Sequence, residues 1–131
     1  MKHAAPRGGE AAPHWKAARE GRLVLPYCEP CNSYAWPLPA ACPQCAGRLE
    51  WRQCQGRGQV VTYSVVHRAV DPALKDDVPY VVAIVALDEG PRLFTNIVEA
   101  TAGAMRCGLR VKCRFEATLD PDYSVAVFAP E

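Results

Sequence analysis

The second half of the chain alternates between short apolar runs and turn residues, which is the pattern of a protein built from β-strands. β-Branched and aromatic residues fill the run VVTYSVV at 60–66. The run RLFTNIV at 92–98 follows the turn DEGP, and the run SVAVF at 124–128 follows the turn DPDY. Such residues fit a pleated, half-buried surface, so each run predicts a strand.

Two further runs predict strands whose apolar residues are spaced differently. The run LRVKCRFE at 109–116 alternates strictly, which places its apolar residues, Cys113 among them, on one buried face. The run YVVAIVAL at 80–87 is almost wholly apolar, as in a strand covered on both faces. With a helical turn expected at 101–105, the five strands fit an OB-type Greek-key barrel.

One short helix is predicted before the strands, over residues 14–20. Pro13 suits a first turn, HWKAARE contains good helix formers, and Gly21 can end the helix. Trp15 and Ala18 give it a small apolar side, too small to stabilise a helix in isolation. We therefore expect the helix to pack on another surface, with Trp15 as a candidate interface anchor. Trp51, by contrast, is expected in the core.

Four cysteines between these parts have the spacing of a zinc ribbon. Cys28, Cys31, Cys42 and Cys45 form the pattern C-x2-C-x10-C-x2-C. Each C-x2-C places two thiolates on one tight turn, about 3.8 Å apart for tetrahedral Zn–S bonds of about 2.3 Å. The intervening residues let the two turns meet around one ion. A site of four cysteines is closed, so the predicted zinc is structural and not catalytic.

The two cysteine turns, or knuckles, differ in the residue that follows each. Asn32 follows the first, and asparagine readily adopts the left-handed backbone conformation. Ala46 follows the second and adopts that conformation poorly, whereas Gly47 comes one residue later. The sequence therefore predicts a second knuckle shifted by one residue.

The chain has seven cysteines, an odd number, and its N-terminus lacks the apolar region of a secretory signal. Both features favour metal binding over disulfides. Cys113 is interpreted as a small core residue, whereas the roles of Cys54 and Cys107 stay open. A thiol–disulfide switch is the less favoured alternative, because neither C-x2-C opens a helix.

Composition indicates a folded protein with no strong field for polyanions. Half of the residues are hydrophobic, 22% are charged, and the formal net charge is +1. No apolar run reaches the length of a membrane span. We expect a cytoplasmic protein with a flexible leader at 1–13, a helix and zinc ribbon at 14–54, and the barrel at 55–131.

Single-stranded nucleic-acid binding is the alternative function from a different class, because zinc ribbons and OB folds recur in such proteins. Arg110, Lys112 and Arg114 form an outward basic stripe on their predicted strand. Acidic residues offset the stripe, and no outward aromatics interleave with it. The sequence therefore makes this alternative unlikely.

Several stretches resemble one bacterial and archaeal family. They are W-x5-G at Trp15 and Gly21, the cysteine quartet, G-x-G-x-V-x-x-Y-S-V-V-H at 56–67, and PYVV from Pro79. The family is that of the zinc-ribbon/OB-fold proteins associated with acyl-CoA enzymes, long labelled a domain of unknown function. The resemblance extends from residue 14 to about residue 128 and implies a mainly β fold: a short helix, a rubredoxin-like zinc ribbon and a five-stranded OB-type barrel.

The resemblance also implies a non-catalytic subunit that docks on a partner enzyme. Partners in the family are thiolase-superfamily proteins (thiolases, acyltransferases or retro-aldolases) or hydratase-type subunits, and the small chain can help shape the channel for a CoA thioester. Besides Trp15, the candidates for contact with a partner or CoA are His67, Arg68 and Lys75 in the long loop at 67–79. A polar strand end and a solvated loop are the simpler interpretations of these three residues. The sequence does not identify the acyl group or the reaction of the complex.

Overall fold

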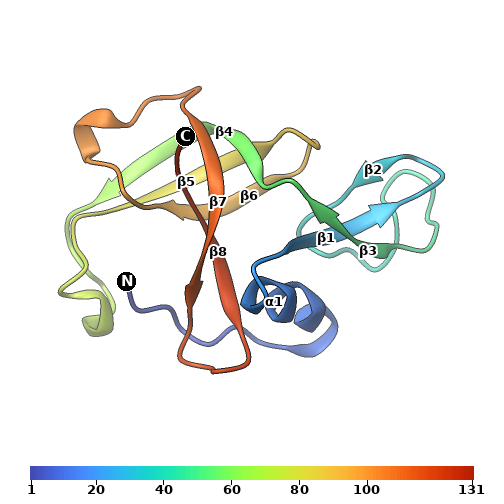
Figure 1. The fold of residues 1–131 in the computed structure, drawn as a ribbon, viewed down its shortest axis with the longest axis horizontal. Coiled ribbons are helices and arrows are strands. Elements are labelled where there is room, and N and C mark those ends of the chain that lie inside the picture. The colour runs from blue at the N-terminus through green and yellow to red at the C-terminus, as the bar shows by residue number, and fades with distance from the viewer.

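The computed structural model describes residues 1–131 as a short helix, a three-stranded sheet and a closed five-stranded barrel (Figure 1). Single 3-10 turns are labelled η. In chain order the elements are η1 (Gly9–Ala11), α1 (Ala12–Arg19), β1 (Leu23–Cys28), β2 (Ser33–Tyr34), β3 (Glu50–Cys54), β4 (Arg57–Val66), η2 (Pro72–Leu74), β5 (Tyr80–Leu87), β6 (Arg92–Ile97), η3 (Ala102–Ala104), β7 (Arg110–Ala117) and β8 (Ser124–Pro130). The mainly β architecture and the helical turn at 101–105 are confirmed.

Helix α1 begins two residues earlier than the pattern predicts and ends at Arg19. Pro13 lies in its first turn, where no intrahelical donor is lost. Gly21 follows the helix with φ +79°, a left-handed conformation that glycine adopts without strain, and its N–H donates to the Ala18 carbonyl at 3.0 Å. As expected for so short a helix, α1 packs on other elements, here β1 and β8.

The three-stranded sheet carries the cysteine knuckles and has the order β2-β1-β3. Strand β1 is buried along its whole length, because β2 and β3 pair with its two edges in antiparallel fashion. Its pairing with β3 runs from Leu23 opposite Cys54 to Tyr27 opposite Glu50. Trp51 lies on β3 at the edge of this sheet and is only partly buried, outside the core cluster. The prediction of a core role for Trp51 is therefore wrong.

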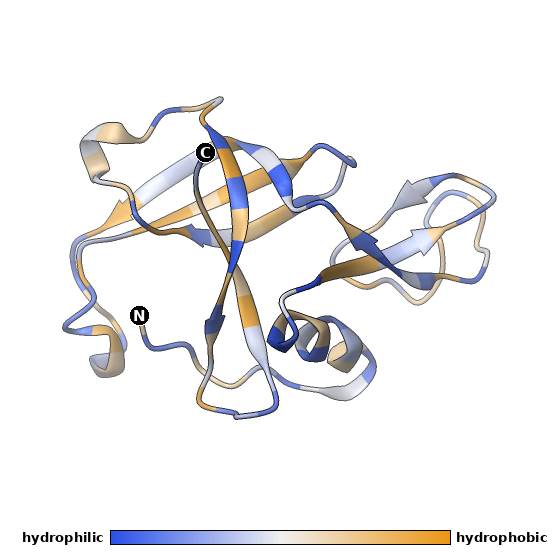
Figure 2. Ribbon diagram, in the orientation of Figure 1, coloured by the Kyte–Doolittle hydropathy of each residue, from blue (hydrophilic) through white to orange (hydrophobic).

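The barrel closes in the order β4-β5-β6-β8-β7. Figure 2 shows hydrophobic and hydrophilic positions alternating along β7, as its sequence predicts. Strand β5 buries every second residue, whereas the residues between them are only partly buried. The expectation of cover on both faces therefore holds only for the inner face, because no element of this chain lies over the outer one.

One hydrophobic core joins the barrel to the base of the ribbon sheet. Phe128, Val111 and Val85 are fully buried at its centre. Leu25 of β1 and Cys54 of β3 belong to the same cluster. Because the two parts share a core, the base of the ribbon is held by the barrel whether or not a metal is bound.

Residues before α1 lie against the barrel. The His3 ring contacts the Glu116 carboxylate at 2.6 Å, and the His3 carbonyl accepts from the Leu119 N–H at 3.1 Å. Gly8 lies so close to the Tyr123 hydroxyl that a Cβ at this position would be 2.6 Å away. The flexibility of residues 1–13 and the division at residues 54 and 55 stay predictions. No helix in the structure is both long enough and apolar enough to cross a membrane.

Candidate metal centre

The first cysteine knuckle is built where β1 turns into β2. Cys28 ends β1 and pairs with Ser33, so the chain reverses direction between these residues. The Asn32 N–H donates to the Glu29 carbonyl at 3.1 Å, and Asn32 has φ +51°. The hydroxyl of Tyr27 donates to the side-chain carbonyl of Asn32. Asn32 therefore takes the left-handed conformation expected of it.

The second knuckle holds Ala46 itself in the left-handed conformation, with φ +60°. The Ala46 N–H donates to the Cys42 carbonyl at 2.8 Å, and the Cys42 N–H donates to the Gly47 carbonyl at 3.0 Å. These two bonds fix the turn and offset a backbone cost of about 1–2 kcal/mol. The predicted shift by one residue does not occur. The Gly47 N–H instead points at the Cys45 sulfur, 3.4 Å away.

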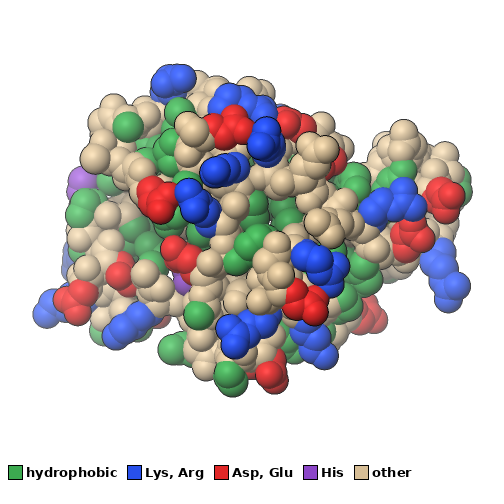
Figure 3. Space-filling model, viewed as in Figure 1, with side chains coloured by type: hydrophobic (Ala, Val, Ile, Leu, Met, Phe, Trp, Pro, Cys, Tyr) green, Lys and Arg blue, Asp and Glu red, His purple; other side chains and the backbone are tan.

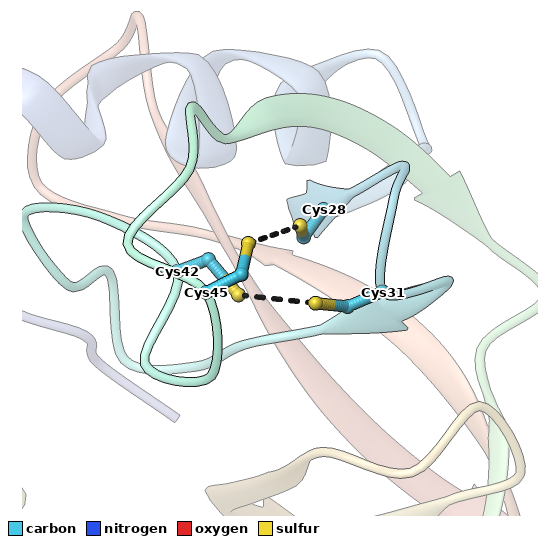
Figure 4. A group of neighbouring side chains, drawn as sticks. All are labelled: Cys28, Cys31, Cys42 and Cys45. Carbon is cyan, nitrogen blue, oxygen red and sulfur yellow. Dashed lines mark hydrogen bonds between the residues drawn. The ribbon is translucent and has the colours of Figure 1, made fainter.

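The four cysteine sulfurs converge, and all lie within 4.8 Å of one another. Figure 4 shows Cys28 facing Cys45 and Cys42 facing Cys31, with sulfur–sulfur distances of 3.5 Å and 3.9 Å respectively. A tetrahedral zinc with Zn–S bonds of about 2.3 Å needs sulfurs about 3.8 Å apart. The residues therefore fit a zinc ion, and the structure groups no other set of histidine, cysteine or acidic residues in this way.

Without a cation these thiols oppose one another's ionisation. Hydrogen bonds with the Cys45 and Cys28 thiols raise the pKa of Cys31 to about 12. The backbone N–H groups of Cys45 and Gln44 point at the Cys42 sulfur and lower its pKa to about 7. A divalent cation offsets the repulsion between the thiolates, so all four cysteines can release their protons and bind the metal as thiolates. The donor set thus suits zinc on chemical as well as geometric grounds.

His14 is a residue that the sequence analysis missed. It is buried on α1, and its Nδ1 donates to the Val24 carbonyl at 2.9 Å, which assigns the ring proton to Nδ1. Burial lowers the pKa of His14 although the Val24 bond opposes the change. Trp36 lies 4.3 Å and Trp15 4.5 Å from the His14 ring, measured between centroids. His14, Ala17 and Ala18 have the i, i+3, i+4 spacing of one helix face, and this spacing could have predicted that His14 is buried.

The other candidate contact residues fall into two separate places. Trp15 is partly buried beside His14, and its indole nitrogen is enclosed without a hydrogen-bond partner. His67, Arg68 and Lys75 are exposed between β4 and β5, at the end of the barrel opposite the ribbon (Figure 1). The structure therefore does not bring these three together with the metal centre or with Trp15.

The remaining cysteines have no metal-binding neighbours. Burial raises the pKa of Cys54 to about 12, and likewise that of Cys113, which packs against the core as its strand phase predicts. Cys107 is exposed. Two of the three are thus poorly reactive thiols held in apolar surroundings.

The two arginines of the basic stripe on β7 form ion pairs with acidic residues that follow β5 and β6. Arg110 makes a two-pronged contact with Asp88, both bonds 2.9 Å, and Arg114 contacts Glu99 at 3.2 Å. Figure 3 shows cationic and anionic side chains mixed over this face rather than a basic track. The β7 face therefore does not present the continuous basic track along which proteins bind single-stranded nucleic acids.

A four-cysteine ribbon joined to a closed OB-type barrel defines the class of zinc-ribbon/OB-fold proteins. Residues 15–52 match the family described as "ChsH2, rubredoxin-like zinc ribbon domain", and residues 51–116 match "ChsH2, C-terminal OB-fold domain". The chain belongs to this ChsH2, or DUF35, family. The membership confirms the resemblance found in the sequence.

Several relatives are similar over much of the chain. A Methanothermobacter thermautotrophicus protein named "DUF35 domain-containing scaffold protein" is 37% identical over 67% of each chain. A Thermomonospora curvata protein named "Probable enoyl-CoA hydratase alpha subunit" is 36% identical over 88% of this chain, which spans only 36% of that relative's length. The solved structure "Ltp2-ChsH2(DUF35) aldolase" superposes with a TM-score of 0.83 and 33% identity, and the match covers 96% of this chain and 98% of that one.

Proposed function

We propose that this protein is a non-catalytic zinc-binding subunit of an acyl-CoA-processing complex, which docks on a thiolase-superfamily partner and helps shape the channel for its CoA thioester. The observation that carries the proposal is the closed donor set. Four thiolates fill the tetrahedron of the metal, so zinc has no position left for a substrate or an activated water. The metal therefore acts on the fold, and the chemistry belongs to another chain.

The names of the relatives support an accessory role. The methanogen relative is called a scaffold protein, and the similar solved structure pairs a ChsH2(DUF35) chain with Ltp2 in an aldolase. The Thermomonospora relative is called a hydratase subunit, so a hydratase-type subunit is the second candidate for the partner, after a thiolase-superfamily protein. In these names the fold occurs as a scaffold, as part of a longer hydratase subunit, and as one chain of an aldolase, which favours assembly over independent catalysis.

Two regions of the chain are candidates for contact with the partner or its substrate. Trp15 presents an indole donor without a partner beside the ribbon. His67, Arg68 and Lys75 are exposed on the opposite end of the barrel, and the two cations have no carboxylate within ion-pair distance. Free cations of this kind suit CoA phosphates or an acidic partner surface.

The test is to purify the chain alone and with the subunit that copurifies with it, and to measure acyl-CoA turnover in each sample. The pair should turn over an acyl-CoA, whereas the chain alone should not. Turnover by the isolated, pure chain would refute the accessory role. A second arm changes both Cys28 and Cys42 to serine; unchanged activity and assembly of that complex would disprove the link between the zinc ribbon and docking.

A further inference from the structure

The barrel is weakly closed between β6 and β8. These strands run parallel and share one bridging pair, Ile97 opposite Phe128, with the Val98 N–H donating to the Phe128 carbonyl at 2.8 Å. Two residues earlier, contact is made by a side chain, because the Thr95 hydroxyl donates to the Ala126 carbonyl at 3.0 Å. Farther from the bridge no β6–β8 pair forms. The two strands therefore part, and a groove lined by residues of both strands and of α1 lies there.

The free edge of β6 faces this groove. In an antiparallel pair, residues alternate between exchanging hydrogen bonds with the partner and pointing away from it. The Leu87 N–H donates to the Pro91 carbonyl, so this pair is a hydrogen-bonded one. Every second pair of the β5–β6 register is then hydrogen-bonded too, which makes Leu93 and Thr95 the residues of β6 that bond to β5. The N–H and C=O groups of Arg92 and Phe94 are therefore turned away from β5. Such unpaired groups are a template for another strand.

The groove, of about 230 Å³, lies along that edge, between β6, β8 and the residues of α1 and the ribbon. Its wall is mainly apolar and aromatic, with Trp36 and Trp15 on one side and Val127 on the other. Trp15 and the buried His14 ring also line it. The groove thus places apolar and aromatic cover beside the free backbone groups of β6.

Phe94 stands at the rim of this groove with 75% of its surface exposed. It also borders two neighbouring hollows, one beside Trp36 and Pro37 and one beside Val82 and Ile84 on the outer face of β5. Val82 and Ile84 are outward residues of the apolar run and are only partly buried. An exposed aromatic surrounded by apolar recesses is typical of an interface anchor.

We propose that the free part of the β6 edge is the docking site for one extended segment of the partner subunit, which adds as a short strand beside Arg92–Phe94 and places its apolar side chains around Phe94. The inference rests on the proposed function, since it requires a partner subunit. Strand addition lets backbone hydrogen bonds supply affinity while the recesses on either side select side chains. It satisfies the backbone groups of Arg92 and Phe94, which a purely side-chain contact leaves unpaired.

Charge favours a segment of the partner that carries a carboxylate. Arg92 is exposed in the neighbouring hollow beside Trp36 and Pro37 and forms no ion pair, so it suits a carboxylate on the incoming segment. Trp15 and Trp36 line the groove together with the strand edge. One extended segment can therefore meet the free backbone groups, the aromatic wall and Arg92 together.

The first experiment changes the rim residue and compares it with a matched control. Phe94→Asp and Leu119→Asp alter residues that are both 75% exposed, so both variants should unfold at the wild-type temperature; only Phe94 lines the groove and the two hollows. Affinity for the copurified partner subunit should fall at least about tenfold for Phe94→Asp and stay within about twofold of wild type for Leu119→Asp. Equal affinities for the two variants would overturn the inference but leave the accessory function intact. Absence of any partner for the wild-type chain would overturn both.

The second experiment asks whether backbone pairing occurs, by single-residue amide hydrogen exchange of the complex. The amide of Phe94 should exchange at least about tenfold more slowly with the partner bound, since an added strand accepts a hydrogen bond from it. The amide of Cys107 should keep its rate, because that exposed residue lies outside the groove and outside the loop at 67–79. Unchanged exchange at Phe94 in a formed complex would rule out strand addition.

Discussion

Removing zinc should unfold the tip of the ribbon and leave the barrel folded. Within the tip, residues 29–46, the backbone bonds are few, chiefly Asn32 to Glu29, Cys42 to Gly47 and Ala46 to Cys42. Only Tyr34 and Trp36, which follow the first knuckle, pack against the core, so the loss of order should be greatest at the two knuckles. The base of the ribbon is different, because β1 and β3 pair along their length and contribute Leu25 and Cys54 to the common core. Chelation should therefore affect the tip of the ribbon and leave its base and the barrel folded.

The magnitudes support this expectation. Each of the three turn bonds contributes about 1 kcal/mol to the folded tip. Zinc bound by four thiolates contributes about 10 kcal/mol or more, which is several times the contribution of these bonds together. Loss of the metal should therefore destabilise the tip far more than loss of any one turn bond. The barrel core, with Phe128 at its centre, does not depend on this contribution.

The assay is amide hydrogen exchange with and without a strong zinc chelator. Amides at 29–46 should lose their protection on chelation, whereas those of β5 should keep theirs to within about twofold. Cys28→Ser should resemble the chelated protein, and the exposed Cys107→Ser should retain one zinc per chain and the full protection. Two results would refute the reasoning: a tip that stays protected without zinc, or a β5 that loses protection together with the tip.

Three further predictions concern stability and thiol reactivity. Gly58→Ala should destabilise the protein by about 2–4 kcal/mol in denaturant unfolding, because a Cβ there would clash with the Ala86 carbonyl oxygen of the paired strand. The control Gly103→Ala, whose Cβ would have no atom within 4 Å, should change stability by less than about 0.5 kcal/mol. Equal effects of the two substitutions would contradict the packing argument. Stability should fall as the pH drops below the ordinary His14 pKa of 6.5, because burial lowers the pKa in the folded state and only the unfolded state then takes up the proton. The free energy of unfolding of His14→Asn should no longer fall with pH in this range. If it falls as steeply as in the wild type, a group other than His14 causes the pH dependence. In the zinc-bound protein, Cys107 should react with a thiol reagent at least about tenfold faster than Cys54, whose buried thiol has a pKa raised to about 12; similar rates in native protein would show that the Cys54 environment opens readily.

Local spacing decided much of what the sequence could predict. The two C-x2-C pairs define their own turns, so the metal centre followed from Cys28, Cys31, Cys42 and Cys45 without knowledge of the rest of the fold. The strands followed from period-two patterns, and α1 followed from helix formers between a proline and a glycine. These features depend on residues near one another in the chain, where backbone geometry limits the choices.

Other features required the tertiary structure, because they join residues far apart in the sequence. Asp88 and Glu99 reach the arginines of β7 only through strand pairing, which turned an apparent basic stripe into ion pairs. His14 and Trp36 meet only because α1 and the ribbon pack on the same side of the barrel. The free edge of β6 exists because β8 diverges from it after one pair. The sequence by itself determined the metal and the strands; the register and crossing of those strands decided which surface is left open for a partner.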